Sequence, residues 1–404
     1  MDIGIIGGGA AGFMAAVTCA STYPYHRVFL FEKTNKLLSK VKISGGGRCN
    51  VTHACFDIGE FCKNYPRGAT FLKKSFHQFF ATHTVEWFER RGVRLKTEPD
   101  GRMFPITDNS QTIIDCFLRE ANQCDVKILT NVEIVSVEKQ EDVFLLRDKQ
   151  QRSYAVQRLM IATGGSPKST GFEWIGKLGH TIEPPVPSLF TFNMPEDKVP
   201  SLMGISVEKT NVGILGTKLQ THGALLFTHW GMSGPAILKL SAWGARILAE
   251  KGYQFQVQVK WLPDREENAF RGELWKQRQT LIRQVENKNP FGFPQRLWSY
   301  FLEKAGIPEG KRWIDTSKKE INKLVEVLFK DTYRVSGKTT YKEEFVTCGG
   351  VSLHEVNPLT MESKVCNGLF FGGEVLDIDG ITGGFNFQAA WTTGYIAGLH
   401  LGKS

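Results

Sequence analysis

Apolar residues follow three patterns along the chain, and each pattern predicts a different kind of element. Uninterrupted apolar runs at Ile3–Ile6 and 158–162 are typical of strands buried on both faces of a parallel sheet. Apolar residues at helical spacing predict amphipathic helices in pieces across 69–124. Alternation of polar and apolar residues over 253–261 predicts a strand with one exposed face. The first part of the chain therefore has the pattern of an α/β domain, and the middle has the pattern of an antiparallel sheet or small barrel.

A Gly-rich hexapeptide, Gly7-Gly8-Gly9-Ala10-Ala11-Gly12, follows the first strand. A helix is expected next, and then a strand that ends at Glu32, which is the context that a dinucleotide-binding fingerprint requires. In this fingerprint Gly7 permits the tight turn, Gly9 lets the backbone approach a pyrophosphate, and Gly12 permits close packing of helix and strand. Glu32 can accept hydrogen bonds from the adenosine ribose. The residues expected to contact the dinucleotide here are Gly7, Gly9, Ala10, Ala11, Gly12, Glu32 and Lys33.

The pattern then changes in a way that predicts an insertion. A Pro-rich stretch at 184–187 is expected to be a domain boundary, because alternating strands follow it. Residues 265–330 are charged and helical by pattern, and Gly-rich sequence returns near the C-terminus. That sequence can meet the first Gly-rich turn only if the chain folds back. We therefore expect an α/β fold with a Rossmann-like domain built from both chain ends (1–188 and 342–404), an inserted β-barrel-like domain (189–263 and 331–341) and a small helical subdomain (264–330).

Three further Gly-rich segments are expected to contact the same ligand. Ser44–Asn50 contains three successive glycines, which is an entropically expensive way to make a simple connection. We expect residues 40–50 to form a loop whose bare backbone lies against a flat ring or a diphosphate. The residues assigned to the cofactor in these segments are Lys42, Ser44, Gly45, Gly46, Gly47, Arg48, Cys49, Asn50, Thr163, Gly164, Gly373, Glu374, Gly384, Phe385, Asn386, Phe387 and Gln388.

Four contact segments indicate a ligand longer than a nicotinamide nucleotide, and FAD fits them. The adenosine would lie at Glu32, the diphosphate at Gly7–Gly12 and the flavin ring against 44–50 and 384–388. A helix beginning near Asn386 would point its positive end at the pyrimidine side of the flavin, which favours the reduced anionic ring. No second fingerprint follows a strand, so NAD(P)H is expected to be a transient reductant without a domain of its own.

Composition limits the metal sites, the compartment and the partners that we expect. The eight cysteines form no C-x-x-C pair and no cluster with zinc spacing, so we expect free thiols, no metal site and a cytoplasmic location. No apolar run is long enough to span a membrane. The net charge of +9 is compatible with an anionic partner. The sequence leaves the oligomeric state open.

Three signatures in order resemble one bacterial flavoprotein family. They are Ser44–Asn50, Phe227–Pro235 and Gly372–Gln388, and the likeness extends over the whole chain. The family is the aminoacetone-oxidase-like, or BaiN-like, group of NAD(P)/FAD-dependent oxidoreductases. The resemblance implies an FAD domain made of both chain ends with a β-barrel-like insert and a helical domain inside it. Reactions linked to the family are amine oxidation, reduction of unsaturated steroid ketones, and reduction of uridine to dihydrouridine in ribosomal RNA.

Two of these reactions share one chemistry, because both substrates carry an alkene conjugated to a carbonyl. Hydride passes from flavin N5 to the β-carbon, the carbonyl oxygen gains negative charge, and a proton reaches the α-carbon. Catalytic candidates are therefore His229, Cys49 and Arg48. His229 has the most suitable intrinsic pKa for a proton donor, although it can equally be a structural residue that holds the turn before Ser233. Cys49 is either a weak acid or a packed thiol.

The partner is expected to be a small unsaturated molecule or a uracil carried on RNA, with ribosomal RNA as one possibility. From Lys304 to Lys342 there are ten Lys or Arg and five Asp or Glu residues, a local net charge of +5. Such a run is either a solvated helix face or a surface that attracts RNA phosphates. An RNA-binding flavoprotein whose catalysis is incidental is the competing class, and NAD(P)H turnover with an added substrate separates the two.

Overall fold

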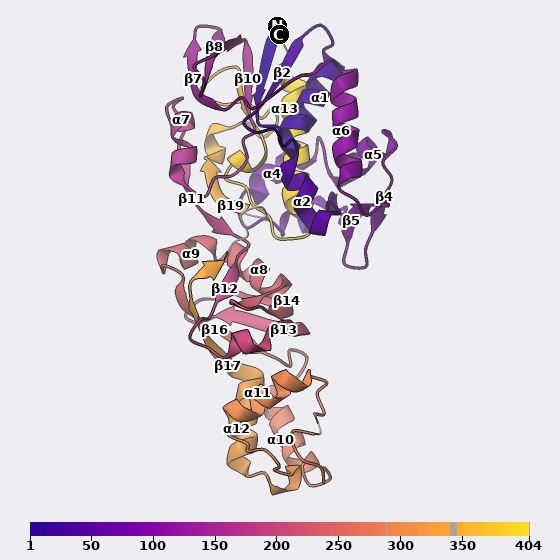
Figure 1. Ribbon diagram of the computed structural model, residues 1–404, viewed down its shortest axis with the longest axis vertical. Coiled ribbons are helices and arrows are strands. Elements are labelled where there is room, and N and C mark those ends of the chain that lie inside the picture. Colours follow the sequence, from indigo (N-terminus) through magenta and orange to yellow (C-terminus); the bar gives the residue numbers. More distant parts are fainter. Residues whose placement is uncertain (288, 340–345, 404) are drawn as a thin grey trace. The chain divides into compact units, whose positions relative to one another are not determined.

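The computed structural model describes residues 1–287, 289–339 and 346–403. The chain divides into two compact units, which we call unit 1 (Met1–Ser188 with Tyr341–Ser404) and unit 2 (Leu189–Thr340). Figure 1 labels helices and strands of both units where there is room. Each unit is described separately below.

Unit 1 is built on a five-stranded parallel sheet (Figure 1). Its order is β20-β10-β1-β2-β6, formed by Leu369–Phe371, Arg158–Ile161, Asp2–Ile6, Arg27–Glu32 and Lys127–Thr130. The strand order reverses between β1 and β10, and open α/β sheets bind ligands at the carboxyl ends of the strands beside such a point. Because β20 pairs in parallel with β10, the C-terminus completes the sheet that the N-terminus begins. The expected Rossmann-like domain built from both chain ends is therefore confirmed.

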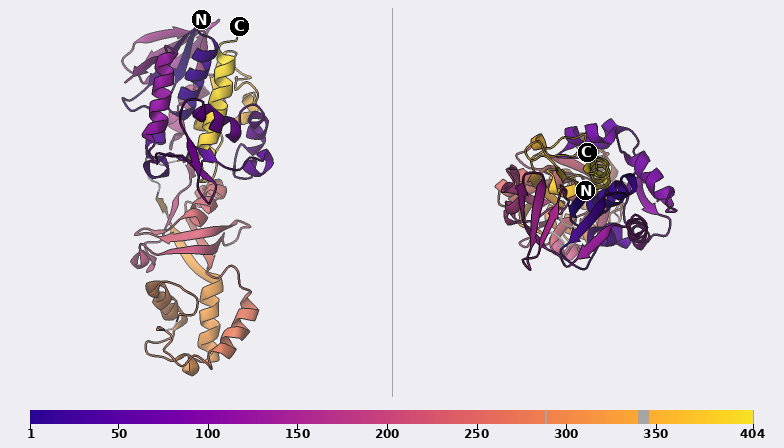
Figure 2. Two further views of the ribbon diagram at one scale, coloured as in Figure 1. Left: turned by 90° about the vertical axis from the view of Figure 1, so that its right-hand side faces the viewer. Right: turned by 90° about the horizontal axis from the view of Figure 1, so that it is seen from above.

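Two helices of small residues pack closely in unit 1. Helix α1 (Ala10–Thr22) and helix α13 (Phe385–Leu401) lie side by side in both views of Figure 2. A side chain at Gly394 would place its Cβ 2.4 Å from the Ala11 carbonyl oxygen, so only glycine permits this approach. Because the two helices pack closely, both of their N-termini lie in unit 1.

The remaining elements of unit 1 form smaller layers. The helices are α2 (Ser39–Gly47), α3 (Ile58–Cys62), α4 (Ala69–Phe76), α5 (Ala81–Glu89), α6 (Gln111–Gln123) and α7 (Glu173–Gly176). Small antiparallel sheets are formed by β3 (Thr52–His53), β5 (Arg102–Pro105) and β4 (Leu95–Thr97), and by β7 (Ile134–Gln140), β8 (Val143–Asp148) and β9 (Ser153–Val156). A two-stranded sheet pairs β11 (Ile182–Ser188) with β19 (Val346–Val351).

The Pro-rich stretch at 184–187, which was expected to be a domain boundary, forms part of a strand directly before the change of units. Pro184, Pro185 and Pro187 lie within β11, whose register with β19 shifts between Glu183 and Val186. Proline has no N–H to donate, so it is tolerated in a short two-stranded sheet at such an irregularity. The change from unit 1 to unit 2 follows directly, at Ser188 and Leu189.

Unit 2 contains a seven-stranded antiparallel sheet. Its order is β17-β16-β13-β14-β15-β12-β18, formed by Asp331–Ser336, Gln254–Lys260, Ser206–Ile214, Gln220–Phe227, Gly231–Ser233, Thr191–Asn193 and Lys338–Thr339. The two edge strands, β17 and β18, are separated in the chain only by Gly337, which has a φ of +109°. The sheet therefore closes on itself through one continuous segment.

Helices of unit 2 share their core with this sheet. They are α8 (Pro235–Trp243), α9 (Ala245–Glu250), α10 (Glu267–Gln277), α11 (Gln295–Ala305) and α12 (Lys318–Lys330). Trp261 beside the sheet and Trp298 of α11 are both fully buried in one hydrophobic cluster. Ser233 precedes α8 and is of a residue type that often caps helices, but it lies in β15, and Gly234 with a φ of +93° is the capping residue. Within the described ranges, no helix is long and apolar enough to cross a membrane.

Candidate cofactor-binding site

The three fingerprint glycines have different surroundings. A Cβ at Gly7 would lie 2.3 Å from the Ala162 carbonyl oxygen, at the point where β1 and β10 end side by side. A Cβ at Gly12 would lie 1.9 Å from the Gly7 carbonyl oxygen. At Gly9, by contrast, no protein atom lies within 4 Å of the Cβ position. Gly7 and Gly12 are therefore required by packing, whereas Gly9 faces open space.

Gly9 is also the residue that caps helix α1, and no side chain provides a capping hydrogen bond. The N–H groups in the first turn of a helix have no partner inside the helix, and they attract anions together with the helix dipole. Ala10 and Ala11 form this first turn. An open space above bare helical N–H groups is the arrangement that a diphosphate requires.

Glu32 ends strand β2 beside this turn. One carboxylate oxygen accepts a hydrogen bond from the Gly8 N–H at 2.9 Å, and the other accepts bonds from the Thr34 N–H and hydroxyl, both at 3.0 Å. These bonds fix the orientation of the carboxylate at the carboxyl end of the sheet. Lys33 is exposed to solvent next to it.

The segment 40–50 is only partly a loop. Residues from Ser39 to Ile43 are helical, and the helix breaks at Ser44. Gly45, Gly46 and Gly47 then have φ angles of +58°, +69° and +84°. The helical start corrects the expectation of a loop from residue 40, and its cause is the apolar pair Val41 and Leu38, both of which are buried. Lys42 hydrogen-bonds to Gln111 at 2.6 Å.

One face of this glycine loop is packed and the other is open. A Cβ at Gly45 would meet the Phe104 ring at 2.9 Å, and the Gly47 carbonyl accepts a bond from the Ser110 N–H at 2.8 Å. At Gly46 and Gly47 no protein atom lies within 4 Å of the Cβ position. The backbone of these two glycines can therefore approach a flat ring closely.

Residues after the loop join it to the start of α13. With its amide turned to satisfy both partners, Asn50 donates to the Thr52 carbonyl at 3.0 Å and accepts from the Gly384 N–H at 2.9 Å. The Thr52 hydroxyl donates to Gln388 at 2.7 Å. His53 contacts the Gly383 carbonyl at 3.1 Å. Thr52 and His53 were missed in the sequence, although they directly follow the Gly-rich signature.

The N-terminus of α13 is held firmly. Asn386 forms two reciprocal hydrogen bonds with the backbone of Gly380, at 2.8 and 2.9 Å, and the Tyr65 hydroxyl donates to the Phe385 carbonyl at 2.6 Å. The buried carboxylate of Asp379 is paired with Arg67 and accepts a bond from Ser188 at 2.7 Å. These bonds fix the direction of the helix dipole. Phe387 follows in the first turn of the same helix.

The carboxyl end of β20 meets the fingerprint. Gly373 has a φ of +74°, and a Cβ there would lie 2.9 Å from the side chain of Ala11. Glu374 accepts bonds from Lys40 and from the Thr347 N–H, both at 2.8 Å. Thr163 and Gly164 follow β10, and the Cβ position of Gly164 is open. The four Gly-rich segments of the sequence are thus brought together in unit 1.

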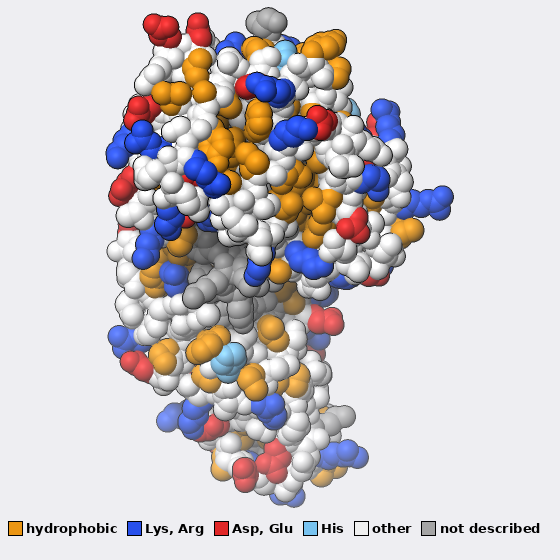
Figure 3. Space-filling view, turned by 45° about the horizontal axis from the view of Figure 1, so that its top comes forward, with side chains coloured by type: hydrophobic (Ala, Val, Ile, Leu, Met, Phe, Trp, Pro, Cys, Tyr) orange, Lys and Arg blue, Asp and Glu red, His pale blue; other side chains and the backbone are white. Residues whose placement is uncertain are grey.

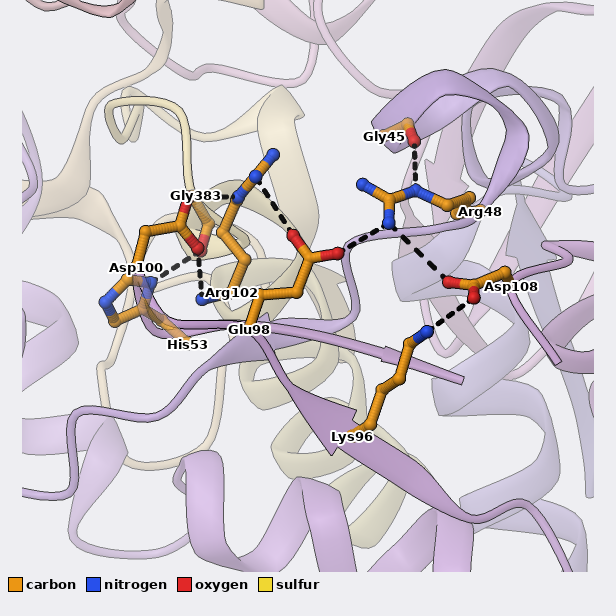
Figure 4. A network of polar contacts seen from close by, with 9 residues as sticks. All are labelled: Gly45, Arg48, His53, Lys96, Glu98, Asp100, Arg102, Asp108 and Gly383. Atoms are coloured by element: carbon orange, nitrogen blue, oxygen red, sulfur yellow. Dashed lines mark hydrogen bonds and ion pairs between the residues drawn. The ribbon is translucent and has the colours of Figure 1, made fainter. Parts of the chain in front are cut away.

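Arg48 has a different environment from the glycines that precede it. Figure 4 shows its guanidinium directed at two carboxylates, Glu98 at 2.6 Å and Asp108 at 3.5 Å. It lies 4.0 Å from the centre of the Phe104 ring. A hydrogen bond from Lys96 lowers the pKa of Asp108, with further contributions from the charges of Lys96 and Arg48. The Arg48 guanidinium therefore already has binding partners within the protein.

Cys49 and His229 lie in different units. The Cys49 thiol is fully buried, and burial raises its pKa to about 12, partly offset by a hydrogen bond with Ser44. A thiol with such a pKa is a weak acid. His229 lies in the turn between β14 and β15 of unit 2, with its ring centre 4.2 Å from that of Trp230. Its part in the reaction remains a prediction.

Four glycines with empty space at the Cβ position show whether the site has room for FAD. Gly9, Gly46, Gly47 and Gly164 belong to three separate segments, and none has a protein atom within 4 Å of its Cβ position. Packing against protein atoms therefore does not explain these glycines. Gly46, Gly47 and Gly164 are explained by their positive φ angles, whereas Gly9 has a φ of −95° that any residue can adopt. A ligand that lies against the backbone explains the glycine at position 9. Across the described ranges no group of three or more His, Cys, Asp or Glu residues could hold a metal ion.

Comparison with known proteins shows the family. Residues 1–400 match the model of the HI0933-like protein Rossmann domain. The chain is 29% identical to the 3-dehydro-bile acid delta(4,6)-reductase of Clostridium scindens over 413 residues, covering 98% of both chains. It is also 29% identical to the ribosomal RNA dihydrouridine synthase of Escherichia coli over 409 residues, covering 98% of this chain and 96% of the relative.

Solved structures share the fold at lower identity. The 3-ketosteroid-delta4-(5alpha)-dehydrogenase of Rhodococcus jostii RHA1 has a TM-score of 0.53 at 12% identity, covering 100% of this chain and 97% of that one. A flavocytochrome c3 fumarate reductase in an open conformation has a TM-score of 0.51 at 14% identity, covering 99% and 78%. With a family model that matches nearly the whole chain, and with the Gly-rich segments gathered at the carboxyl ends of the sheet, the protein is a member of the HI0933-like family of FAD-dependent oxidoreductases.

Proposed function

We propose that the protein reduces a C=C bond conjugated to a carbonyl group, with NAD(P)H as the source of electrons. The observation that carries this proposal is the equal similarity to two relatives with different substrates. Their names describe a reductase of an unsaturated bile acid and a synthase of dihydrouridine in ribosomal RNA. A 4,6-unsaturated 3-ketosteroid and a uracil ring are both alkenes conjugated to a carbonyl, so one reaction accounts for both.

Residues of unit 1 have defined tasks in this reaction. The first turn of α1 would bind the diphosphate of FAD, Glu32 would bind its ribose, and the backbone of Gly46 and Gly47 would hold its ring. The N-terminus of α13 would provide positive potential that favours the reduced, negatively charged ring. Bound FAD would supply hydride to the β-carbon of the substrate. Among the candidate acids, we assign the proton to His229, since the raised pKa of Cys49 makes it a poor donor.

Uracil in RNA is the second candidate substrate, and it is supported by the ribosomal RNA relatives of Escherichia coli and Haemophilus influenzae. The basic run from 304 to 342 supports it less than its net charge of +5 indicates, because Lys330 and Arg334 pair with Glu267 and Glu196, two acids outside the run. Figure 3 shows Lys and Arg interspersed with Asp and Glu on the visible face. Residue 342 lies outside the described residues.

The test begins with the purified protein. Its absorbance spectrum identifies the flavin, and anaerobic mixing with NADH or NADPH identifies the reductant. The reduced protein is then mixed with a 3-keto-4-ene steroid or with a uridine-containing ribosomal RNA fragment, and the oxidised protein is mixed anaerobically with aminoacetone. Reoxidation by the steroid or the RNA with formation of the saturated product supports the proposal. Reduction of the oxidised flavin by aminoacetone, without reoxidation of the reduced flavin by the steroid or the RNA, would refute it in favour of amine oxidation.

The role of His229 is tested separately in the reoxidation step. We expect His229→Ala to slow product formation while leaving flavin reduction by NAD(P)H unchanged. His222→Ala is the matched control, because His222 is an exposed histidine on β14 of the same unit. Equal rates for the two variants would remove His229 as the proton donor. In cells, loss of dihydrouridine from ribosomal RNA on gene deletion would identify the RNA substrate, and unchanged dihydrouridine would exclude it.

A further inference from the structure

The glycine loop at 45–47 has a conformation that the loop alone does not hold. Three successive residues have φ angles between +58° and +84°, and Cys49 follows with a φ of +63°. Glycine visits this region freely but also leaves it freely, so a glycine run keeps one shape only where other groups hold it. The open face at Gly46 and Gly47 leaves the holding contacts to the opposite face.

Arg48 provides one of these contacts, in addition to the Ser110 N–H that bonds to the Gly47 carbonyl. Its Nε lies 3.4 Å from the Gly45 carbonyl oxygen, which accepts the hydrogen bond, and its Nη1 lies 2.6 Å from Glu98. Its guanidinium also stacks on Phe104, the ring that a Cβ at Gly45 would meet. One side chain thus connects the loop backbone to the sheet formed by β3, β5 and β4, as Figure 4 shows.

The electrostatic setting makes Arg48 a poor site for a ligand anion. Glu98 and Asp108 both lie against its guanidinium. Glu98 is shared with Arg102 at 3.0 Å, and Arg102 pairs with Asp100 at 2.6 Å. A phosphate or a substrate oxyanion next to Arg48 would therefore also approach two carboxylates, and like charges repel at this range.

We propose that Arg48 is a positioning residue that acts through Glu98 to hold the 45–47 backbone in the shape that receives the flavin. The inference uses the FAD site of unit 1 and adds a role for a residue that the sequence pattern had assigned to direct contact with phosphate or oxyanion. It does not depend on which substrate is reduced. If the role of Arg48 is refuted, the proposed reaction is unaffected. If the proposed reaction is refuted, the role of Arg48 is unaffected.

A double-mutant cycle on FAD affinity tests the proposal. The variants are Arg48→Met, Glu98→Gln and the double variant, and the Kd for FAD is measured by fluorescence titration of the apo-protein. We expect each single variant to weaken binding about tenfold, and the double variant to be no weaker than either single one, because contacts that act as a unit are not additive. Arg48→Lys should restore only part of the affinity, since lysine cannot both stack on Phe104 and fork between Gly45 and Glu98.

Direct contact with FAD would give the opposite result. Removing the charge of Glu98 would then free Arg48, so Glu98→Gln would leave binding unchanged or tighten it, and this outcome overturns the proposal. Effects that add in the double variant would also overturn it. A readout that does not use FAD is hydrogen exchange at the amides of 45–49 in the apo-protein, which we expect to be faster in both single variants. Unchanged exchange would refute the positioning role.

A matched control is available in the same unit. Arg91 pairs with Glu120 at 2.9 Å and stacks on Trp87 at 3.9 Å, so it repeats the chemistry of Arg48 on helix α5's C-terminal side. Arg91→Met and Glu120→Gln should lower the Tm of the apo-protein without changing the Kd for FAD. If the control pair weakened FAD binding as much as the Arg48 pair, the effect would be one of general stability and the proposal would fail.

Discussion

Replacing Gly9 with leucine should separate cofactor binding from folding. Gly9 has a φ of −95° and a ψ of −167°, an extended conformation that leucine adopts without strain. No protein atom lies within 4 Å of its Cβ position, so the apo-protein has room for the side chain. The same space receives the diphosphate in the proposed complex. Leucine should therefore leave the fold intact and exclude FAD.

The expected loss can be worked out from the helix N-terminus. A hydrogen bond to a charged group contributes about 1.5–3 kcal/mol. If leucine moves the diphosphate away from two N–H groups of α1, binding loses about 3–6 kcal/mol, which corresponds to a Kd about 10²–10⁴-fold higher. The variant should be isolated without yellow colour.

Gly12→Ala is the matched change with the opposite result. Its Cβ would lie 1.9 Å from the Gly7 carbonyl oxygen, so the turn or the helix has to move. Overpacking of this kind usually costs about 1–3 kcal/mol in the free energy of unfolding. This variant should therefore lower the Tm of the apo-protein, whereas Gly9→Leu should not.

Two measurements on the same apo-protein samples check the pair of variants. Thermal unfolding followed by circular dichroism gives the Tm, and quenching of FAD fluorescence gives the Kd. If Gly9→Leu bound FAD as tightly as the unaltered protein, the diphosphate would not lie over the first turn of α1. If it unfolded as early as Gly12→Ala, the open space would not exist in solution, and the reasoning from this geometry would be refuted.

Three further predictions concern packing, acid stability and thiol reactivity. Gly394→Val should lower the Tm of the apo-protein, because a Cβ would lie 2.4 Å from the Ala11 carbonyl oxygen and valine adds two methyl groups beyond it. Partial burial of Glu320 is outweighed by hydrogen bonds from Lys311 and Ser317, so its pKa is lowered from 4.5. The stability that these bonds give is present above about pH 4.5 and is lost as the pH falls through the lowered pKa; Glu320→Gln should flatten this acid limb in unfolding curves of the protein. Cys49, with a pKa of about 12, should stay unmodified by iodoacetamide at pH 8 in the native protein, as peptide mass spectrometry would show, and rapid labelling would contradict its burial.

Local patterns determined the nucleotide-binding part of the fold. The apolar run at Ile3–Ile6, the glycine spacing and the acid at Glu32 are all read within the first 32 residues, since each depends on backbone conformation or on neighbours in the chain. The participation of the C-terminus followed from a second Gly-rich turn that had to meet the first. The pairing of β20 with β10 confirms this arrangement.

Patterns that depend on distant partners gave wrong details. Serine is a typical helix-capping residue, but Ser233 lies in the sheet because β15 pairs with β14 and β12. Gly234 is the capping residue instead. The prolines at 184–187 gave no sign of a strand, yet β19 supplies a partner strand that comes more than 150 residues later. Propensity describes what a residue favours alone, and tertiary pairing overrides it.

Motifs in the sequence were enough to predict the dinucleotide-binding turn, the use of both chain ends in one sheet and the family to which the protein belongs. These predictions depend on glycines that adopt a conformation, or permit a close approach, that no other residue allows. The tertiary structure alone decided what each charged side chain does. Arg48 follows three glycines and looks free to bind an anion, but Glu98 and Asp108, which follow strands β4 and β5, lie against its guanidinium. The partner of a charge is set by the fold, because an ion pair joins residues that are far apart in the chain and close in space.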